Sequence, residues 1–214
     1  MRRLLILVVR EIRDQLAYFV GAAAFSVLLV PLLVSLVLGE CREVAGLISV
    51  TILLPGGVLF TLFVCGFGAA QMVSDRGKNL SAFLTVLPVT RGQVFVARLT
   101  AGILWILTCL VPVTITGTIL IKLKTPPGIP LYGGLLMDLL AGAFLMCFAC
   151  YCCGLYGGWR TGTPVMWLAI LPFAALLPLL IAVKGFGTEL VILLLLFIAA
   201  CLTGTWNRYS RSSL

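Results

Sequence analysis

Cysteine is the residue with the clearest chemical potential in this chain of 214 residues, which holds eight cysteines and no histidine. Four of the eight gather within two turns of one predicted helix: Cys147, Cys150, Cys152 and Cys153. Thiolates can bind a metal ion, but four cysteines so close in a helix point around several faces and do not converge on one ion. We predict no metal site and interpret these cysteines as small packing residues, with thiolate binding as the weaker alternative.

The sequence gives little support for acid–base catalysis or for phosphate binding by this chain. The seven acidic residues are scattered along the chain, so no pair is placed for general acid–base work. Without histidine there is no His-dependent triad. The phosphate-loop pattern is also missing, because Gly77-Lys78 is followed by Asn79 and lacks the upstream glycine. We therefore expect no catalytic residue and no cofactor in this chain, and any energy for uphill work would come from a partner.

The composition is that of a membrane protein. Hydrophobic residues make up 62% of the chain and charged residues only 10%, with a mean hydropathy of +1.20; in soluble domains the apolar share is about half. We predict an all-α membrane protein that forms one domain over residues 1–214. Six spans are expected, at about residues 16–38, 47–72, 95–121, 131–157, 164–183 and 190–206.

The basic residues predict the orientation. Under this six-span topology, eleven of the fifteen Lys and Arg residues face one side. Only four face the other side: Arg42, Lys122, Lys124 and Lys184. The positive-inside rule then places both termini in the cytoplasm, in a multi-pass protein of the plasma or inner membrane. This distribution also disfavours nucleic-acid binding, since the charges are explained by helix orientation and contact with anionic lipid.

The first fifteen residues predict a helix that lies on the membrane rather than across it. Leu5, Val8, Val9, Ile12 and Leu16 form one apolar stripe at helical spacing, and charged residues follow another side. An interfacial amphipathic helix on the cytoplasmic leaflet has this pattern. A plain cytoplasmic extension of the first span is the alternative.

Two features inside the predicted spans are candidates for a translocation path. Pro55-Gly56-Gly57 predicts a break in the second span, and a broken span needs protein or a water-filled cavity over its freed backbone groups; a plain packing kink is the alternative. Asp138 is a carboxylate near the outer end of the fourth span, which by default suggests a function. Neutralisation by Lys122 or Lys124 is the structural alternative for Asp138.

The stretch from Ser74 to Leu99 is the longest interval of mixed polarity. Its charged residues exclude it from mid-bilayer. Asn79 can cap a short helix that Pro88 ends, and Thr90 with Gln93 predicts a capping box at the start of the next helix. One face of the short helix is apolar, and it consists of Leu80, Phe83, Leu84 and Leu87. A short helix with one apolar face between two spans suits docking into a groove of another protein, so we predict a coupling helix.

These residues resemble the cytoplasmic segment of permease subunits of ABC-2 type transporters. The resemblance covers about 25 residues, from the acidic/basic cluster through Leu87-Pro88-Val89-Thr90-Arg91 to Arg98. Arg98 stands where lysine is usual in that family and Asp75 where glutamate is common, and both differences keep the charge. The resemblance implies that the following residues dock the ATPase: Asp75, Arg76, Leu80, Phe83, Leu84, Leu87, Pro88 and Arg91.

The resemblance implies an ABC-2 type transmembrane domain that serves as the permease of an ATP-driven exporter. Its partners would be a separate cytoplasmic ABC ATPase, which holds ATP and Mg, and a second permease copy or paralogue. A haem-exporter permease for cytochrome c maturation is an alternative, because the run from Leu171 to Leu180 is similar to a stretch in those proteins. A non-transporting scaffold subunit and a membrane enzyme acting on lipid or prenyl groups stay open as well. The apolar path leaves the transported substrate open.

The predicted orientation can be tested by thiol labelling of intact cells. Cys41, in an outer loop, is expected to react with a membrane-impermeant thiol reagent added outside, whereas a cysteine introduced by Ser210→Cys is expected to stay unlabelled. Labelling with the opposite sidedness would overturn the orientation and, with it, the coupling role of residues 74–99.

Overall fold

The computed structural model describes residues 2–38, 42–77, 90–124, 132–158 and 187–211, and every element in them is an α-helix. The helices are α1 (Arg2–Asp14), α2 (Leu16–Leu38), α3 (Arg42–Gly77), α5 (Arg91–Lys124), α6 (Tyr132–Gly158) and α8 (Thr188–Arg211). Long apolar sequence favours helices because a helix satisfies its backbone hydrogen bonds internally, without water. The predicted all-α class is confirmed for this part of the chain.

Four of the described helices are long and apolar enough to cross a membrane. The qualifying stretches are Gly56–Val73, Gly92–Leu120, Leu140–Gly158 and Thr188–Ser210. A fifth would be the bent pair formed by α1 and α2, whose axes differ by 71°. The expected span at 164–183 lies outside the described residues, so the structure supports a multi-pass membrane protein while the total of six stays a prediction.

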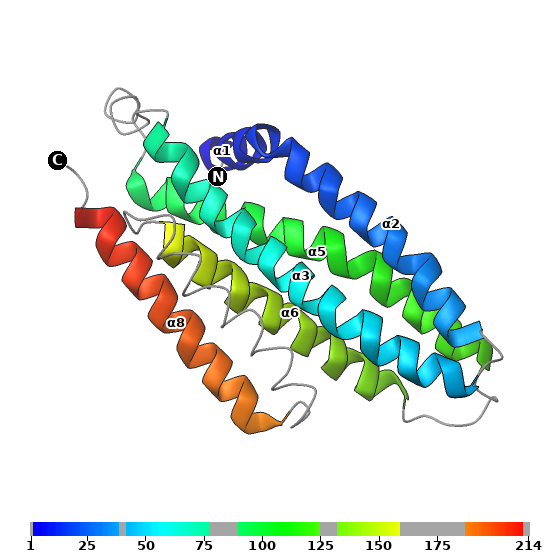
Figure 1. The fold of residues 1–214 in the computed structure, drawn as a ribbon. Helices are drawn as coiled ribbons and strands as arrows, with labels where there is room; N and C mark the ends of the chain where they lie inside the picture. The colour runs from blue at the N-terminus through cyan, green and yellow to red at the C-terminus, as the bar shows by residue number, and fades with distance from the viewer. Residues whose placement is uncertain (1, 39–41, 78–89, 125–131, 159–186, 212–214) are drawn as a thin grey trace.

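The helices run side by side between two ends of the molecule, and both termini lie at the same end (Figure 1). At this end α3 and α6 finish and α5 begins (Figure 1). Helix α6 packs against α3 on one side and α8 on the other, while α5 packs against α2. Helix α1 turns away from the axis of α2 and lies against the first part of α5.

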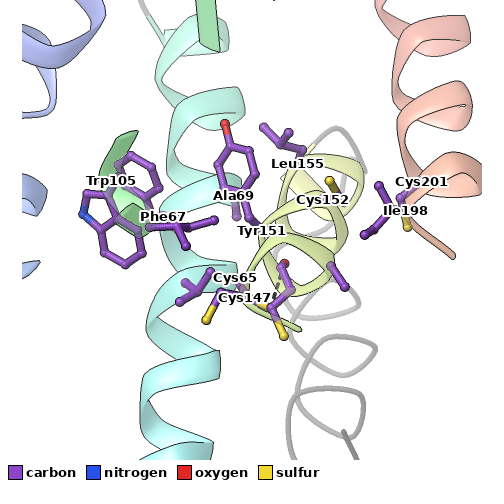
Figure 2. Packing of buried hydrophobic residues seen from close by; sticks show 14 of the residues in the cluster. Cys65, Phe67, Ala69, Trp105, Cys147, Tyr151, Cys152, Leu155, Ile198 and Cys201 are labelled. Atoms are coloured by element: carbon purple, nitrogen blue, oxygen red, sulfur yellow. Dashed lines mark hydrogen bonds between the residues drawn. The ribbon is translucent and has the colours of Figure 1, made fainter. Parts of the chain in front are cut away.

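An aromatic cluster fills the space between α2, α3 and α5. The rings of Phe67 on α3 and Trp105 on α5 are stacked with centroids 4.7 Å apart, and both side chains are fully buried (Figure 2). The Trp105 indole Nε1–H donates a hydrogen bond to the Tyr18 carbonyl oxygen at 2.9 Å, which ties α5 to the start of α2. A buried tryptophan needs such a partner for its N–H group.

Small residues bring α3 and α6 into backbone contact. A Cβ atom added at Gly154 would overlap the carbonyl oxygen of Cys65, and one added at Gly158 would lie 2.8 Å from the carbonyl oxygen of Ala69. Gly68 plays the same part from α3, because its Cβ would lie 2.5 Å from the Tyr151 carbonyl oxygen. Gly154 and Gly158 are four residues apart, the spacing of a Gly-x-x-x-Gly contact. At these two positions the α6 glycines allow the close approach of α3.

Two sequence-based expectations about helix length differ from the structure. Helix α3 continues through Pro55-Gly56-Gly57 instead of breaking there, because one proline removes a single ladder hydrogen bond, which a long membrane helix can absorb. The last span is expected to end at about residue 206, whereas α8 continues to Arg211. The buried ring of Tyr209 explains this extension, since it packs 6.1 Å from Phe95 of α5.

The backbone contact of α6 with α3 predicts a cost for adding a single methyl group. Gly154→Ala should lower the free energy of unfolding by about 1–3 kcal/mol, because the helices must separate to admit the Cβ atom. The matched control is Gly117→Ala on α5, where a Cβ atom meets nothing within 4 Å. Thermal unfolding in detergent, followed by circular dichroism, measures both; equal melting temperatures for the two variants would contradict the proposed close contact.

Candidate functional site

The segment expected to dock an ATPase lies between the end of α3 and the start of α5. Asp75 and Arg76 belong to the last turn of α3, and Arg91 is the first residue of α5. The remaining residues of the predicted docking set lie outside the described residues: Leu80, Phe83, Leu84, Leu87 and Pro88. The coupling helix itself therefore stays a prediction from sequence.

The start of α5 follows the capping pattern expected from Thr90 and Gln93. The Thr90 N–H donates to the Gln93 side-chain oxygen Oε1 at 3.3 Å, and the Gln93 N–H donates to the Thr90 carbonyl oxygen at 2.9 Å. The side-chain bond is the reciprocal half of a capping box, which satisfies a backbone donor that has no partner within the helix. This part of the prediction is confirmed. It marks where α5 begins after residues 78–89, which we call the docking segment because the sequence predicts docking there.

A buried polar cluster lies just inside this end of the bundle, and its centre is Arg98 of α5. The Arg98 side chain is only 3% exposed, and its Nε lies 3.5 Å from Oε1 of Glu11 on α1. The Arg98 Nη1 also donates to the Met72 sulfur of α3 at 3.6 Å. A buried cation needs an anionic partner to offset the loss of its hydration, so Glu11 makes the buried position of Arg98 possible.

Tyr151 of α6 extends this cluster to a fourth helix. Its hydroxyl donates to Oε1 of Gln71 on α3 at 2.6 Å and lies 3.0 Å from the Arg98 carbonyl oxygen. A Cβ atom at Gly102 of α5 would overlap the Tyr151 ring, so the glycine makes room for it. Within the described part of the chain, the Gln71 Nε2 is buried without a hydrogen-bond partner. The polar cluster therefore consists of Glu11, Gln71, Met72, Arg98 and Tyr151, drawn from four helices.

The candidate path residues lie apart from this cluster. Gly56 and Gly57 are half-buried on α3, and a Cβ atom at either would meet nothing within 4 Å. The side chain of Pro55 lies outside the described set. Asp138 is exposed on α6, just before the apolar stretch Leu140–Gly158. A role of these residues in translocation stays a prediction.

The cysteines are spread through the helix contacts. The Cys65 thiol on α3 donates to the Cys150 carbonyl oxygen at 3.1 Å, while Cys152 of α6 and Cys201 of α8 belong to the buried apolar cluster (Figure 2). Among the described residues, no group of three or more Cys, Asp or Glu side chains is placed to hold a metal ion. The described cysteines are free thiols, and all of them except Cys153 are buried.

Sequence reasoning placed Arg98 beside the docking segment but missed its contact with α1. The pairing of Glu11 with Arg98 joins residues 87 positions apart, and no local pattern specifies it. The available signal was compositional: Glu11, Gln71 and Arg98 are polar residues within or beside strongly apolar helices, where each requires a partner.

Comparison with protein-family models, with curated proteins and with solved structures gives no match for this chain.

The bond from Tyr151 predicts an unequal effect of two tyrosine substitutions. Tyr151→Phe should lower the free energy of unfolding by about 1–3 kcal/mol, because it leaves the buried Gln71 amide without its remaining bond. Tyr156→Phe on the same helix is the control, since the Tyr156 hydroxyl accepts from the exposed Arg208 side chain at 3.1 Å, and it should cost less than about 1 kcal/mol. Chemical denaturation in detergent compares the two; an equal loss would argue against the buried cluster.

Proposed function

We propose that the chain is the membrane-spanning permease subunit of an ATP-driven ABC exporter and works with a separate cytoplasmic ATPase subunit. The observation that carries the proposal is the sequence from Asp75 to Arg98, which resembles the coupling segment of ABC-2 type permeases. Two copies, or this chain and a paralogue, would pair and enclose the path of the substrate. ATP-driven movement of the ATPases would alternate access to that path.

The arrangement of the helices supports this proposal. The docking segment joins the end of α3 to the start of α5, at the end of the molecule where both termini lie (Figure 1). The excess of basic residues predicts that this end is cytoplasmic, which is the side on which an ATPase binds. Four apolar helices of membrane-spanning length supply a body that a docked ATPase could move.

The polar contacts inside the same end support mechanical transmission. Met72 and Gln71 lie within two turns of the end of α3, and Arg98 lies two turns into α5. Their contacts with each other and with Tyr151 of α6 join the two helices that flank the docking segment to the rest of the bundle. A displacement of the segment would therefore reach several helices at once.

The docking role of the segment can be tested with two double variants. Phe83→Asp with Leu84→Asp should weaken binding of the ATPase by orders of magnitude, because each apolar side chain contributes roughly 1.5–3 kcal/mol when buried and the charges oppose docking. Ala82→Asp with Thr85→Asp is the control: it adds the same charge on the opposite side of the predicted helix and should bind nearly as well.

Capture of the partner from membranes of the source cell, followed by identification of bound ATPase subunits, is the measurement. Both variants should still insert, because the segment lies outside the hydrocarbon core. Retention of the ATPase and of transport by the Phe83→Asp, Leu84→Asp protein would show that the docking assignment is wrong. A partner without an ATPase domain on the unmodified chain would favour the scaffold alternative.

A further inference from the structure

The contact between α3 and α6 places cysteines of both helices side by side. Cys65 lies on α3 (Figure 2), and its thiol donates a hydrogen bond to the Cys150 carbonyl oxygen of α6 at 3.1 Å. The Cys65 thiol is also in hydrogen-bonding contact with the thiols of Cys150 and Cys153. All three residues are free cysteines. The permease role proposed above does not use them.

The backbones of the two helices are close enough at this level for a disulfide. A Cβ atom added at Gly154, the residue after Cys153, would lie 3.0 Å from the Cys65 Cα atom. A disulfide needs Cα atoms about 4.4–6.8 Å apart and Cβ atoms that point toward each other. The contact between their thiols shows that the side chains of Cys65 and Cys153 meet. Joining the two sulfur atoms therefore requires little movement of either helix.

The two sulfur atoms differ in their access to a reagent from outside the bundle. Cys65 is fully buried, whereas Cys153 is half-buried and is the one described cysteine that is not buried. Cys153 also lies within the last two turns of α6, which ends at Gly158. A reactive cysteine must be reached by its reagent, and a buried cysteine is normally inert. An oxidant would therefore meet Cys153 first.

We propose that Cys65 and Cys153 are a redox pair that closes a disulfide between α3 and α6 when a hydroperoxide enters the membrane. In the first step, the Cys153 sulfur attacks the peroxide: an S–O bond forms, the O–O bond breaks, and the thiol proton leaves with the alcohol. The Cys65 sulfur then attacks the resulting sulfenic acid, so that the S–S bond forms and hydroxide departs with the Cys65 proton as water. The two thiols lose two electrons, and the hydroperoxide gains them.

The surroundings of the pair favour an apolar hydroperoxide, such as an oxidised lipid, as the oxidant. Cys153 belongs to the stretch Leu140–Gly158, which is apolar enough to cross a membrane, and a lipid hydroperoxide partitions into the same phase. The disulfide would fix α3 to α6 covalently at the glycine contact. Exchange with another thiol would open it again, so the link is reversible. This pairing depends on the residues of this chain alone and does not rest on the proposed function.

The pair is tested with the full chain in nanodiscs exposed to cumene hydroperoxide. After free thiols are blocked with N-ethylmaleimide, digestion without reductant and mass spectrometry should find the peptide of Cys65 linked to the peptide that holds Cys153, and dithiothreitol should separate them. Cys153→Ser should abolish the link. Cys150→Ser and Cys152→Ser are the matched controls, because each removes a neighbouring thiol from α6 and should leave the link intact. No link in the unmodified chain, or a link that persists in Cys153→Ser, would overturn the proposal.

The order of the two steps is tested by removal of the second thiol. Cys65→Ser keeps a donor for the Cys150 carbonyl oxygen but offers no sulfur, so oxidised Cys153 should persist as a sulfenic acid and react with dimedone. In Cys153→Ser, the buried Cys65 should stay unmodified under the same treatment. Dimedone on Cys65 in Cys153→Ser, or no adduct on Cys153 in Cys65→Ser, would overturn the assignment of Cys153 as the residue that meets the peroxide.

Discussion

The backbone contact between α3 and α6 is the interaction on which the other contacts depend. Apolar surfaces gain little by meeting in a lipid environment, so helix association relies on close packing and on internal hydrogen bonds. Gly68, Gly154 and Gly158 allow that packing, because side chains at these positions would meet the backbone or Cβ atoms of the facing helix. Once the two helices are in this register, Tyr151 enters the space between α3 and α5, and its ring lies 6.0 Å from that of Phe67. The position of the polar cluster follows from the glycine contact.

The cluster in turn explains why a charged residue can occupy the interior of α5. Arg98 is nearly inaccessible, and such a cation is tolerated only with a partner of opposite charge and acceptors close by. That partner comes from α1, a helix outside the apolar core. The carbonyl oxygen of Arg98 is also within 3.0 Å of the Tyr151 hydroxyl, so side chain and backbone of one residue join α1, α5 and α6. Removal of Glu11 would take from the buried Arg98 cation its carboxylate partner, which makes the arrangement specific rather than simply stable.

The sequence predicted the features that depend on local physics. Long apolar runs indicated the helices, and Thr90 with Gln93 indicated the start of α5. The expected break at Pro55–Gly57 was wrong because a long helix absorbs one missing hydrogen bond. The extension of α8 to Arg211 and the pairing of Glu11 with Arg98 could not be predicted, since both depend on contacts between distant parts of the chain. Polar composition gives no measure of which helices will meet.

In the proposed exporter, the driving force would come from the separate ATPase as movement, and the helix contacts define which parts of the chain would move together. Helices α3 and α6 are joined at backbone distance and would move as one unit, because close-packed contacts are not continuously deformable. Helix α1 lies at 71° to α2 and contacts α5, where Glu11 pairs with Arg98, so it lies outside the glycine contact. A displacement of the ends of α3 and α5 would therefore shift α3 and α6 together. It would also change the surroundings of Arg98, which contacts α1 through Glu11 and α3 through Met72. In the proposed exporter, the rigid pair of α3 and α6 would carry docking at one end into rearrangement across the membrane.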